Sequence, residues 1–189
     1  MTKLEAVNLV LMACGQPPTS SLDTGGPSSV GIVERLIDQE ATATQTEGWH
    51  FNRRSNVVIT RDVDNKVPVP ANVLAIDIEQ SPVNVTHING FLYDLDDNTD
   101  VFTFDPTVNY VLNIAWDQVP VYVRNFIAHQ AACRFAEMRD FRERLAILYA
   151  RRDSARTRAR RMDGEQSDKT VAGTDQVRRA TGYRMNPWN

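Results

Sequence analysis

The chain has 189 residues, of which 42% are hydrophobic and 24% are charged, and its formal net charge is −3. This length and composition are typical of a soluble globular protein with one sizeable core, with or without a small inserted module. The sequence shows neither a charged-then-apolar leader nor an uninterrupted apolar run of about 18 residues, so we expect no secretion signal and no membrane anchor. Cys14 and Cys133 are expected to be reduced thiols, which indicates synthesis in the cytoplasm.

Charge is distributed unevenly along the chain. Residues 1–130 contain 7 Lys or Arg against 16 Asp or Glu, a balance of −9, whereas residues 131–189 contain 14 against 8, a balance of +6. Such a dipolar chain is suited to meeting a partner, or copies of itself, through complementary faces. A basic helix that is merely solvated and balances an acidic domain explains the same distribution, and the sequence leaves both interpretations open.

The first 46 residues predict two amphipathic helices. Thr2 and Glu5 have the spacing of a capping box, which satisfies backbone N–H groups at a helix start, and the apolar positions after them predict a helix that ends at Gly15. Residues 17–29 are rich in Pro, Gly and Ser and predict a loop. A second apolar stripe then predicts a helix that runs to about Thr46.

From Trp49 the apolar period changes from that of a helix to that of a strand. Asn89-Gly90 lies between two β-rich runs and is a strong signal for a type I′ hairpin, and residues 96–98 predict the next turn. We therefore expect a small antiparallel sheet or barrel spanning about residues 52–116. Its predicted strands are 56–60, 73–79, 83–88, 91–95, 101–104 and 109–116.

Helical periodicity returns after Pro120 and predicts a long closing helix. Its core-facing apolar stripe consists of Val123, Ile127, Ala131, Phe135 and Met138. Asp140 and Glu143 have the spacing of a second capping box, so we expect a break near Arg139. Neither the first two helices nor the closing one can bury its stripe alone, so the helices must pack together and the β-rich segment becomes an insertion between them.

The predicted fold class is therefore α+β: a helical bundle with an inserted small antiparallel β domain and an extended C-terminal helix and tail. The predicted domains are the bundle, residues 1–48 and 119–162, the β domain, residues 49–118, and the tail, residues 163–189. A structural junction is expected where the chain leaves the bundle for the sheet. Its residues are Gly48, which ends the second helix, Trp49 and Phe51, which fill the seam, and Asn52.

Residues that could carry catalysis or hold a metal do not form a recognisable pattern. The three histidines lie in unrelated segments without metal-ligand spacing: His50, His87 and His129. Acidic residues 94–100 resemble a calcium loop in composition but lack its central glycine and terminal glutamate. Cys14 and Cys133 lie far apart on apolar helical segments and are expected to be buried, reduced thiols. We expect no enzymatic activity, no metal and no cofactor.

After Tyr149 the apolar face of the closing helix ends, and an arginine cluster follows: Arg151, Arg152, Arg156, Arg158, Arg160 and Arg161. This segment either frays in water or is held by something outside its own domain. Guanidinium groups neutralise phosphates, so nucleic-acid binding is one interpretation, although no aromatic residues interleave the cluster for base stacking. Contact with an acidic protein surface and a solvated helix are the other two, and the residues alone leave all three open.

Two short motifs carry a resemblance to a known family. The segment AVNLVLMACGQPPTSSL (6–22) contains a G-x-P-P turn after a helix with small residues, and TEGWHFN (46–52) contains a G-W-x-F-N corner. With the β insertion and the closing helix, their order and separation resemble the tail tubular protein A family of short-tailed double-stranded DNA bacteriophages. The match is close over residues 4–52 and architectural over 53–162, and the segment beyond cannot be aligned.

The resemblance implies a structural virion protein, located in the tail, that acts as a head-to-tail adaptor or gatekeeper. Family members form a ring, typically of twelve copies, between the capsid portal and the tail nozzle, and the genome passes through it. By this resemblance the chain would contact itself, the portal, the nozzle (tubular protein B) and neighbouring parts such as tail fibres. Its acidic residues could line the DNA channel. The portal contacts would come from the arginine cluster together with Tyr183 and Trp188.

Overall fold

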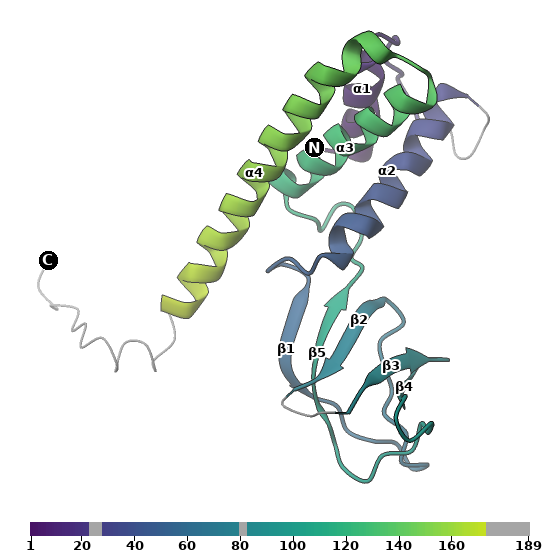
Figure 1. The fold of residues 1–189 in the computed structure, drawn as a ribbon, viewed down its shortest axis with the longest axis vertical. Helices are drawn as coiled ribbons and strands as arrows, with labels where there is room; N and C mark the ends of the chain where they lie inside the picture. Colours follow the sequence, from purple (N-terminus) through teal and green to yellow (C-terminus); the bar gives the residue numbers. More distant parts are fainter. Residues whose placement is uncertain (23–27, 80–82, 173–189) are drawn as a thin grey trace, which may run out of the picture.

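The structure, a computed structural model, describes residues 1–22, 28–79 and 83–172, with side chains described as far as residue 167. Four helices gather at one end of the molecule and five strands at the other (Figure 1). This is the α+β class predicted from the sequence. Among the described helices, none is both long enough and apolar enough to cross a membrane.

The first two helices begin and end at the signals in the sequence. Helix α1 (Lys3–Ala13) opens with the predicted capping box, in which the Glu5 N–H donates to Thr2 Oγ1 and the Glu5 carboxylate accepts the Thr2 N–H. It ends where Gly15 takes a positive φ of 74°. Helix α2 (Ser29–Thr46) begins at Ser28, whose hydroxyl accepts the N–H of Gly31, an N-cap that stabilises the helix start.

Helices α3 (Val121–Met138) and α4 (Arg142–Ala172) are separated by the predicted break. The expected capping box at Asp140 is wrong. Asp140 has a φ of 56°, and the Phe141 N–H donates to the Ala136 carbonyl at 2.9 Å, which makes Asp140 the left-handed residue that ends α3. An N-cap needs extended backbone, so Asp140 cannot also cap α4.

Helix α4 corrects the prediction of an extended tail from residue 163. The helix runs to Ala172, so the first ten residues of that predicted tail are helical. At a rise of about 1.5 Å per residue, its 31 residues span about 46 Å, and its C-terminal turns extend past the other helices (Figure 1). Residues 173–189 lie outside the described part of the chain.

The strands form two antiparallel groups. Strands β1 (Arg53–Val58), β5 (Thr107–Leu112) and β2 (Val73–Ile78) make a three-stranded sheet in that order, and β3 (Val85–Ile88) pairs with β4 (Phe91–Asp94). The antiparallel arrangement confirms the predicted one. The Asn89-Gly90 turn has positive φ at both residues, 53° and 83°, as a type I′ turn requires.

The predicted strand at residues 101–104 is not formed. Val101 makes only an isolated bridge to Lys66, and Phe102 is buried while its N–H donates to the Asn65 carbonyl. A run of β-type residues becomes a strand only when a neighbouring strand supplies its hydrogen bonds, and here only one position finds such a partner. The Phe102 ring is anchored as a single apolar side chain instead.

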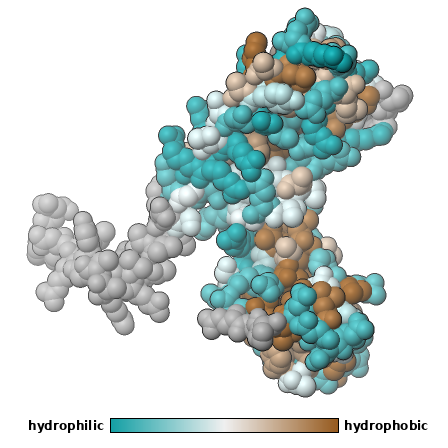
Figure 2. All heavy atoms as spheres, in the orientation of Figure 1, coloured by the Kyte–Doolittle hydropathy of each residue, from teal (hydrophilic) through white to brown (hydrophobic). Residues whose placement is uncertain are grey.

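Two separate hydrophobic clusters hold the fold together. The larger cluster lies among the helices, with α3 in contact with α1, α2 and α4, and it includes the predicted stripe residues Val123, Ile127 and Phe135. Met138, the last predicted stripe residue, is instead 60% exposed. The smaller cluster lies in the β-rich half, and Val67, Leu92 and Val108 are its fully buried members. Figure 2 shows a narrow waist between the two ends of the molecule.

Candidate functional site

The residues of the predicted junction, Gly48-Trp49-His50-Phe51-Asn52, form a tight corner directly after α2. Gly48 has a φ of 69°, a conformation that glycine adopts without strain. The Trp49 side chain is fully buried, and its indole N–H donates to the Thr44 carbonyl at 2.7 Å. Its ring lies 6.4 Å from that of Phe126 on α3. The corner therefore anchors the end of α2 in the helical core.

Asn52 joins this corner to the sheet. Its side chain is fully buried, and its Oδ1 accepts the Trp49 N–H at 2.9 Å. Its Nδ2 donates to the Gln45 carbonyl on α2 at 2.9 Å and to the Leu112 carbonyl on β5 at 2.8 Å. One amide thus satisfies backbone groups from α2, the corner and β5, which fixes where the chain enters and leaves the β-rich segment.

Gln45 makes a second link that the sequence did not reveal. This side chain is 1% exposed, and its amide exchanges hydrogen bonds with the backbone of Ile114: Oε1 accepts the Ile114 N–H at 2.8 Å and Nε2 donates to the carbonyl at 3.2 Å. Nε2 also donates to Asn113 Oδ1. A polar residue on the buried side of a predicted helix was the available signal, because buried amides must find partners.

Helix α4 is held against the corner by part of the arginine cluster. The Arg160 guanidinium lies 4.0 Å above the Trp49 ring, and the Arg156 guanidinium lies 5.7 Å from the centre of the Phe126 ring. Both guanidinium groups also pair with the Glu47 carboxylate. Cation–π contacts of this kind contribute about 0.5–1 kcal/mol each at exposed sites.

Asp163 adds a further contact between α4 and the corner. Its carboxylate accepts the backbone N–H of His50 at 3.1 Å, and a turn later the Gln166 side chain accepts the Tyr122 hydroxyl at 2.9 Å. Ala155 and Ala159 are buried on the same helix. The segment after Tyr149 is therefore held by other parts of the same chain, among them Trp49 and His50 of the predicted β domain, so the expectation that it frays in water is wrong.

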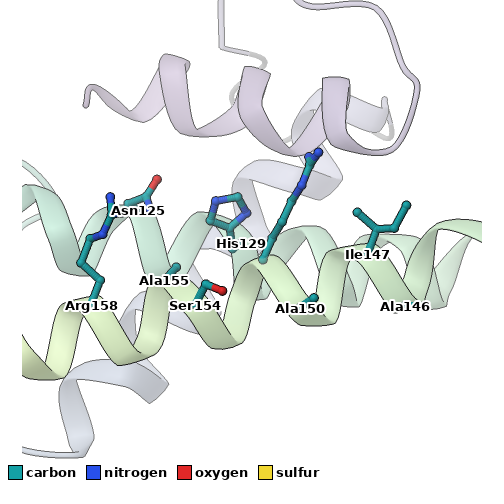
Figure 3. Close-up of a pocket in the computed structure, with 9 residues that line it drawn as sticks. Asn125, His129, Ala146, Ile147, Ala150, Ser154, Ala155 and Arg158 are labelled. Carbon is teal, nitrogen blue, oxygen red and sulfur yellow. The ribbon is translucent and has the colours of Figure 1, made fainter.

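The remaining arginines of the cluster have different surroundings. Arg152 pairs with Asp153 and lies 5.0 Å from the Tyr149 ring centre, and Arg161 pairs with Glu165 at 3.7 Å. The two others have no hydrogen-bond or ion-pair partner among the described residues: Arg151 and Arg158. They line a groove beside α3 (Figure 3). Tyr183 and Trp188, the other predicted portal contacts, lie outside the described residues.

Groups with catalytic potential are not assembled in the part of the chain that the structure describes. No set of three or more His, Cys, Asp or Glu side chains gathers there as metal ligands would. Asp94, in the predicted calcium-like segment, instead accepts the backbone N–H groups of Asp96 and Asp97 in a turn. Both cysteines are buried free thiols, as predicted, and burial raises the pKa of Cys133 to about 11, which keeps it protonated and unreactive at neutral pH.

Comparison with known proteins gives two consistent matches. A family model described as tail tubular protein matches residues 4–170, which extends from the start of α1 almost to the end of α4. The tail tubular protein A of Klebsiella phage KP34 is 26% identical over 133 residues, covering 68% of this chain and 68% of that protein. The matched region thus includes both the corner and the arginine cluster.

Proposed function

Because the chain belongs to the tail tubular protein family and is therefore a structural protein of a phage tail, we propose that it assembles into a ring that joins the capsid portal to the tail nozzle. The ring would contain about twelve copies, as in the family that the sequence resembles, and would carry no catalytic activity. Genomic DNA would pass through its centre. The observation that carries this proposal is the family match across residues 4–170.

The proposed division of labour follows the two hydrophobic clusters. The helices would form the ring body as one domain, with residues 1–48 and 119–162, and the β domain, residues 49–118, would face the nozzle protein or neighbouring tail fibres. The network around Asn52 and Gln45 supports this arrangement, since it fixes the β-rich segment to the end of α2 at both of its connections. A rigid connection would keep the two faces of a ring in register.

The C-terminal turns of α4 are the proposed portal contact, together with Tyr183 and Trp188 further along the chain. These turns extend past the other helices (Figure 1), and the surface of α4 visible in Figure 2 is largely hydrophilic. Arg156 and Arg160 are occupied by Glu47 and by aromatic rings, so in this proposal they orient the helix. The portal contacts would then fall to side chains beyond them.

The test is mass-resolved size analysis of the purified chain, alone and mixed with the portal protein of the same phage. A variant that ends at Ala172 is the useful truncation, because it keeps the Asp163 and Gln166 contacts that hold α4. We expect a ring or a portal complex from the full chain and a weaker portal complex from the truncated one. The proposal would be contradicted if the full chain stayed monomeric and formed no complex with the portal protein.

Nucleic-acid binding by the arginine cluster is the alternative function. Intramolecular partners occupy four of its six guanidinium groups, which leaves Arg151 and Arg158 as the two without an ion-pair partner in the described part of the chain. With about two phosphates neutralised, the logarithm of the DNA association constant should fall with a slope of only about −2 against the logarithm of salt concentration. This alternative would be favoured if the chain bound DNA with a salt-dependence slope near −5 and did not bind the portal protein.

A further inference from the structure

A continuous groove runs along α3 between α1 and α4. Figure 3 shows α4 forming one wall, α1 lying across from it, and Asn125 and His129 of α3 between them. The part beside His129 has a volume of about 720 Å³, and a second part of about 640 Å³ continues toward the start of α1. Asn125 and Arg158 line both parts, so the two form one elongated groove.

The walls of this groove are largely apolar. Ala146, Ala150 and Ala155 present small side chains from α4, which leaves room for another element to approach closely. Two large apolar residues at its edges are well exposed, Ile147 at 59% and Val121 at 54%. Exposed apolar side chains that border a depression are typical of a surface that another protein covers.

The charge in the groove is positive and uncompensated. Arg151 and Arg158 lie seven residues apart on α4, two turns of helix or about 10.5 Å, and the described residues offer neither of them a hydrogen-bond or ion-pair partner. Glu5 lines the far end, where its carboxylate already accepts the Thr2 N–H and lies 3.6 Å from the terminal amine. In the floor, His129 Nδ1 is buried, and no residue that the structure describes forms a hydrogen bond with it.

We propose that this groove binds an amphipathic α-helix of a partner protein that carries two carboxylates seven residues apart. Carboxylates at that spacing on a helix lie about 10.5 Å apart, which matches the separation of Arg151 and Arg158 along α4. Apolar side chains of that helix on either side of the two carboxylates would cover Ile147 and Val121 in the helix-in-groove manner.

Other occupants match the groove less well. Residues 173–189 of this chain contain three arginines and one aspartate, so their positive charge opposes that of the groove. Nucleic acid would gain two phosphate contacts, and it would find no platform for base stacking beside them, because, among the described residues, the only aromatic ring that lines the groove besides the imidazole of His129 is that of Tyr122, whose hydroxyl is bonded to Gln166. An acidic helix satisfies both the charge and the apolar surface. This inference goes beyond the proposed ring, and it holds for a monomeric chain equally well.

The test uses the full chain and a fluorescent amphipathic helical peptide of about 20 residues, long enough to span the groove. One peptide carries two Glu seven residues apart between Leu positions, a matched peptide carries Gln there, and a third carries Lys. The protein variants are Arg151→Glu with Arg158→Glu, and a control, Arg54→Glu with Arg142→Glu, which makes the same charge change at exposed positions outside the groove. Circular dichroism verifies that both variants fold.

We expect the Glu peptide to bind at least about tenfold more tightly than the Gln peptide, a difference of about 1.4 kcal/mol. The groove variant should lose that preference and gain affinity for the Lys peptide, whereas the control should behave like the unaltered chain. A photo-crosslinking residue at Ile147 should join to the Glu peptide, which would locate the contact in the groove.

Three results would overturn the inference. These are no binding of the Glu peptide, equal binding of the Glu and Gln peptides, or an equal loss of affinity in the groove variant and the control. Light scattering provides the remaining check. If the unaltered chain self-associates and the groove variant does not, the occupant is a second copy of this chain and not a separate acidic helix. Portal binding is measured separately, so failure of this inference leaves the ring proposal standing.

Discussion

Replacing Asn52 with alanine is expected to lower the free energy of unfolding by about 3–4 kcal/mol. The side chain makes three buried hydrogen bonds, with Trp49, Gln45 and Leu112, and each contributes about 1 kcal/mol net. The Trp49 N–H makes only this hydrogen bond among the described residues, and stranding such a donor costs about 1 kcal/mol more. The Gln45 carbonyl still accepts a hydrogen bond from the Gly48 N–H in the variant, so losing the Asn52 donor costs less free energy there.

Urea titration followed by circular dichroism and by tryptophan fluorescence measures this change, since Trp49 lies in the altered network. Asn52→Asp is the informative companion variant. It preserves the shape and the acceptor but turns the two donated hydrogen bonds into contacts between a buried carboxylate and two carbonyls, so it should destabilise the chain more than alanine does. Gln39→Ala, on the exposed side of α2, is the control and should change stability by less than about 0.5 kcal/mol.

The reasoning fails if Asn52→Ala costs less than about 1 kcal/mol, because three buried hydrogen bonds would then contribute no more than one ordinary contact. It also fails if Asn52→Asp is milder than Asn52→Ala. That order would mean that the side chain fills space at the corner, and that its amide donors are not what connects α2 to β5.

Three further experiments test other parts of the fold. Gly48→Ala places a Cβ 3.1 Å from Arg53 Nη2 at a φ of 69°, and it should lower the free energy of unfolding, measured by urea titration, by about 1–2 kcal/mol. Gly164 lies within α4, and an added Cβ there would meet no atom within 4 Å, so Gly164→Ala should raise the free energy of unfolding by about 0.5–1 kcal/mol. Burial, reinforced by Arg151, lowers the pKa of His129 below its ordinary 6.5, so the unfolded chain binds more protons below that pH. The free energy of unfolding should therefore fall as the pH is lowered from 7 to 5. It should fall less steeply in the His129→Gln variant, and identical slopes for the two proteins would exclude His129 as a cause. Because the pKa of Cys133 is about 11, iodoacetamide at pH 8 should modify it in urea and leave it intact in the folded chain, as mass spectrometry would show.

Features that depend on neighbouring residues were predictable from the sequence. The capping box at Thr2, the glycine that ends α1 and the Asn89-Gly90 turn all formed as expected, because each arises from backbone preferences within a few positions. The antiparallel α+β arrangement followed from the order of periodicities along the chain. The strand expected at residues 101–104 failed because a strand also depends on a distant partner, which a local pattern does not reveal.

The docking of α4 was not predictable by the same means. The buried residues of this segment, Ala155 and Ala159, are too small to form a recognisable apolar stripe, and arginines in a helical pattern indicate a solvated face. Their guanidinium groups nevertheless cover Trp49 and Phe126, as long cationic side chains do when their stems lie along apolar surface. The contact of Asp163 with His50 joins residues more than 100 positions apart, and no local sequence signal announces such a pair.

The arginine cluster therefore has two faces, and the helical period separates their effects. Arg156 and Arg160 are one turn apart and lie over aromatic rings, so reversing both charges should cost about 1–3 kcal/mol through lost cation–π contacts and repulsion from Glu47. Arg151 and Arg158 lie on another side of α4 and have no ion-pair or hydrogen-bond partner among residues 1–22, 28–79 and 83–167, so reversing both charges should change the free energy of unfolding in urea by less than about 0.5 kcal/mol. Equal losses from the two pairs would refute this separation. If the separation holds, a binding defect from the second pair reports on a partner, whereas a defect from the first pair reports on the orientation of α4.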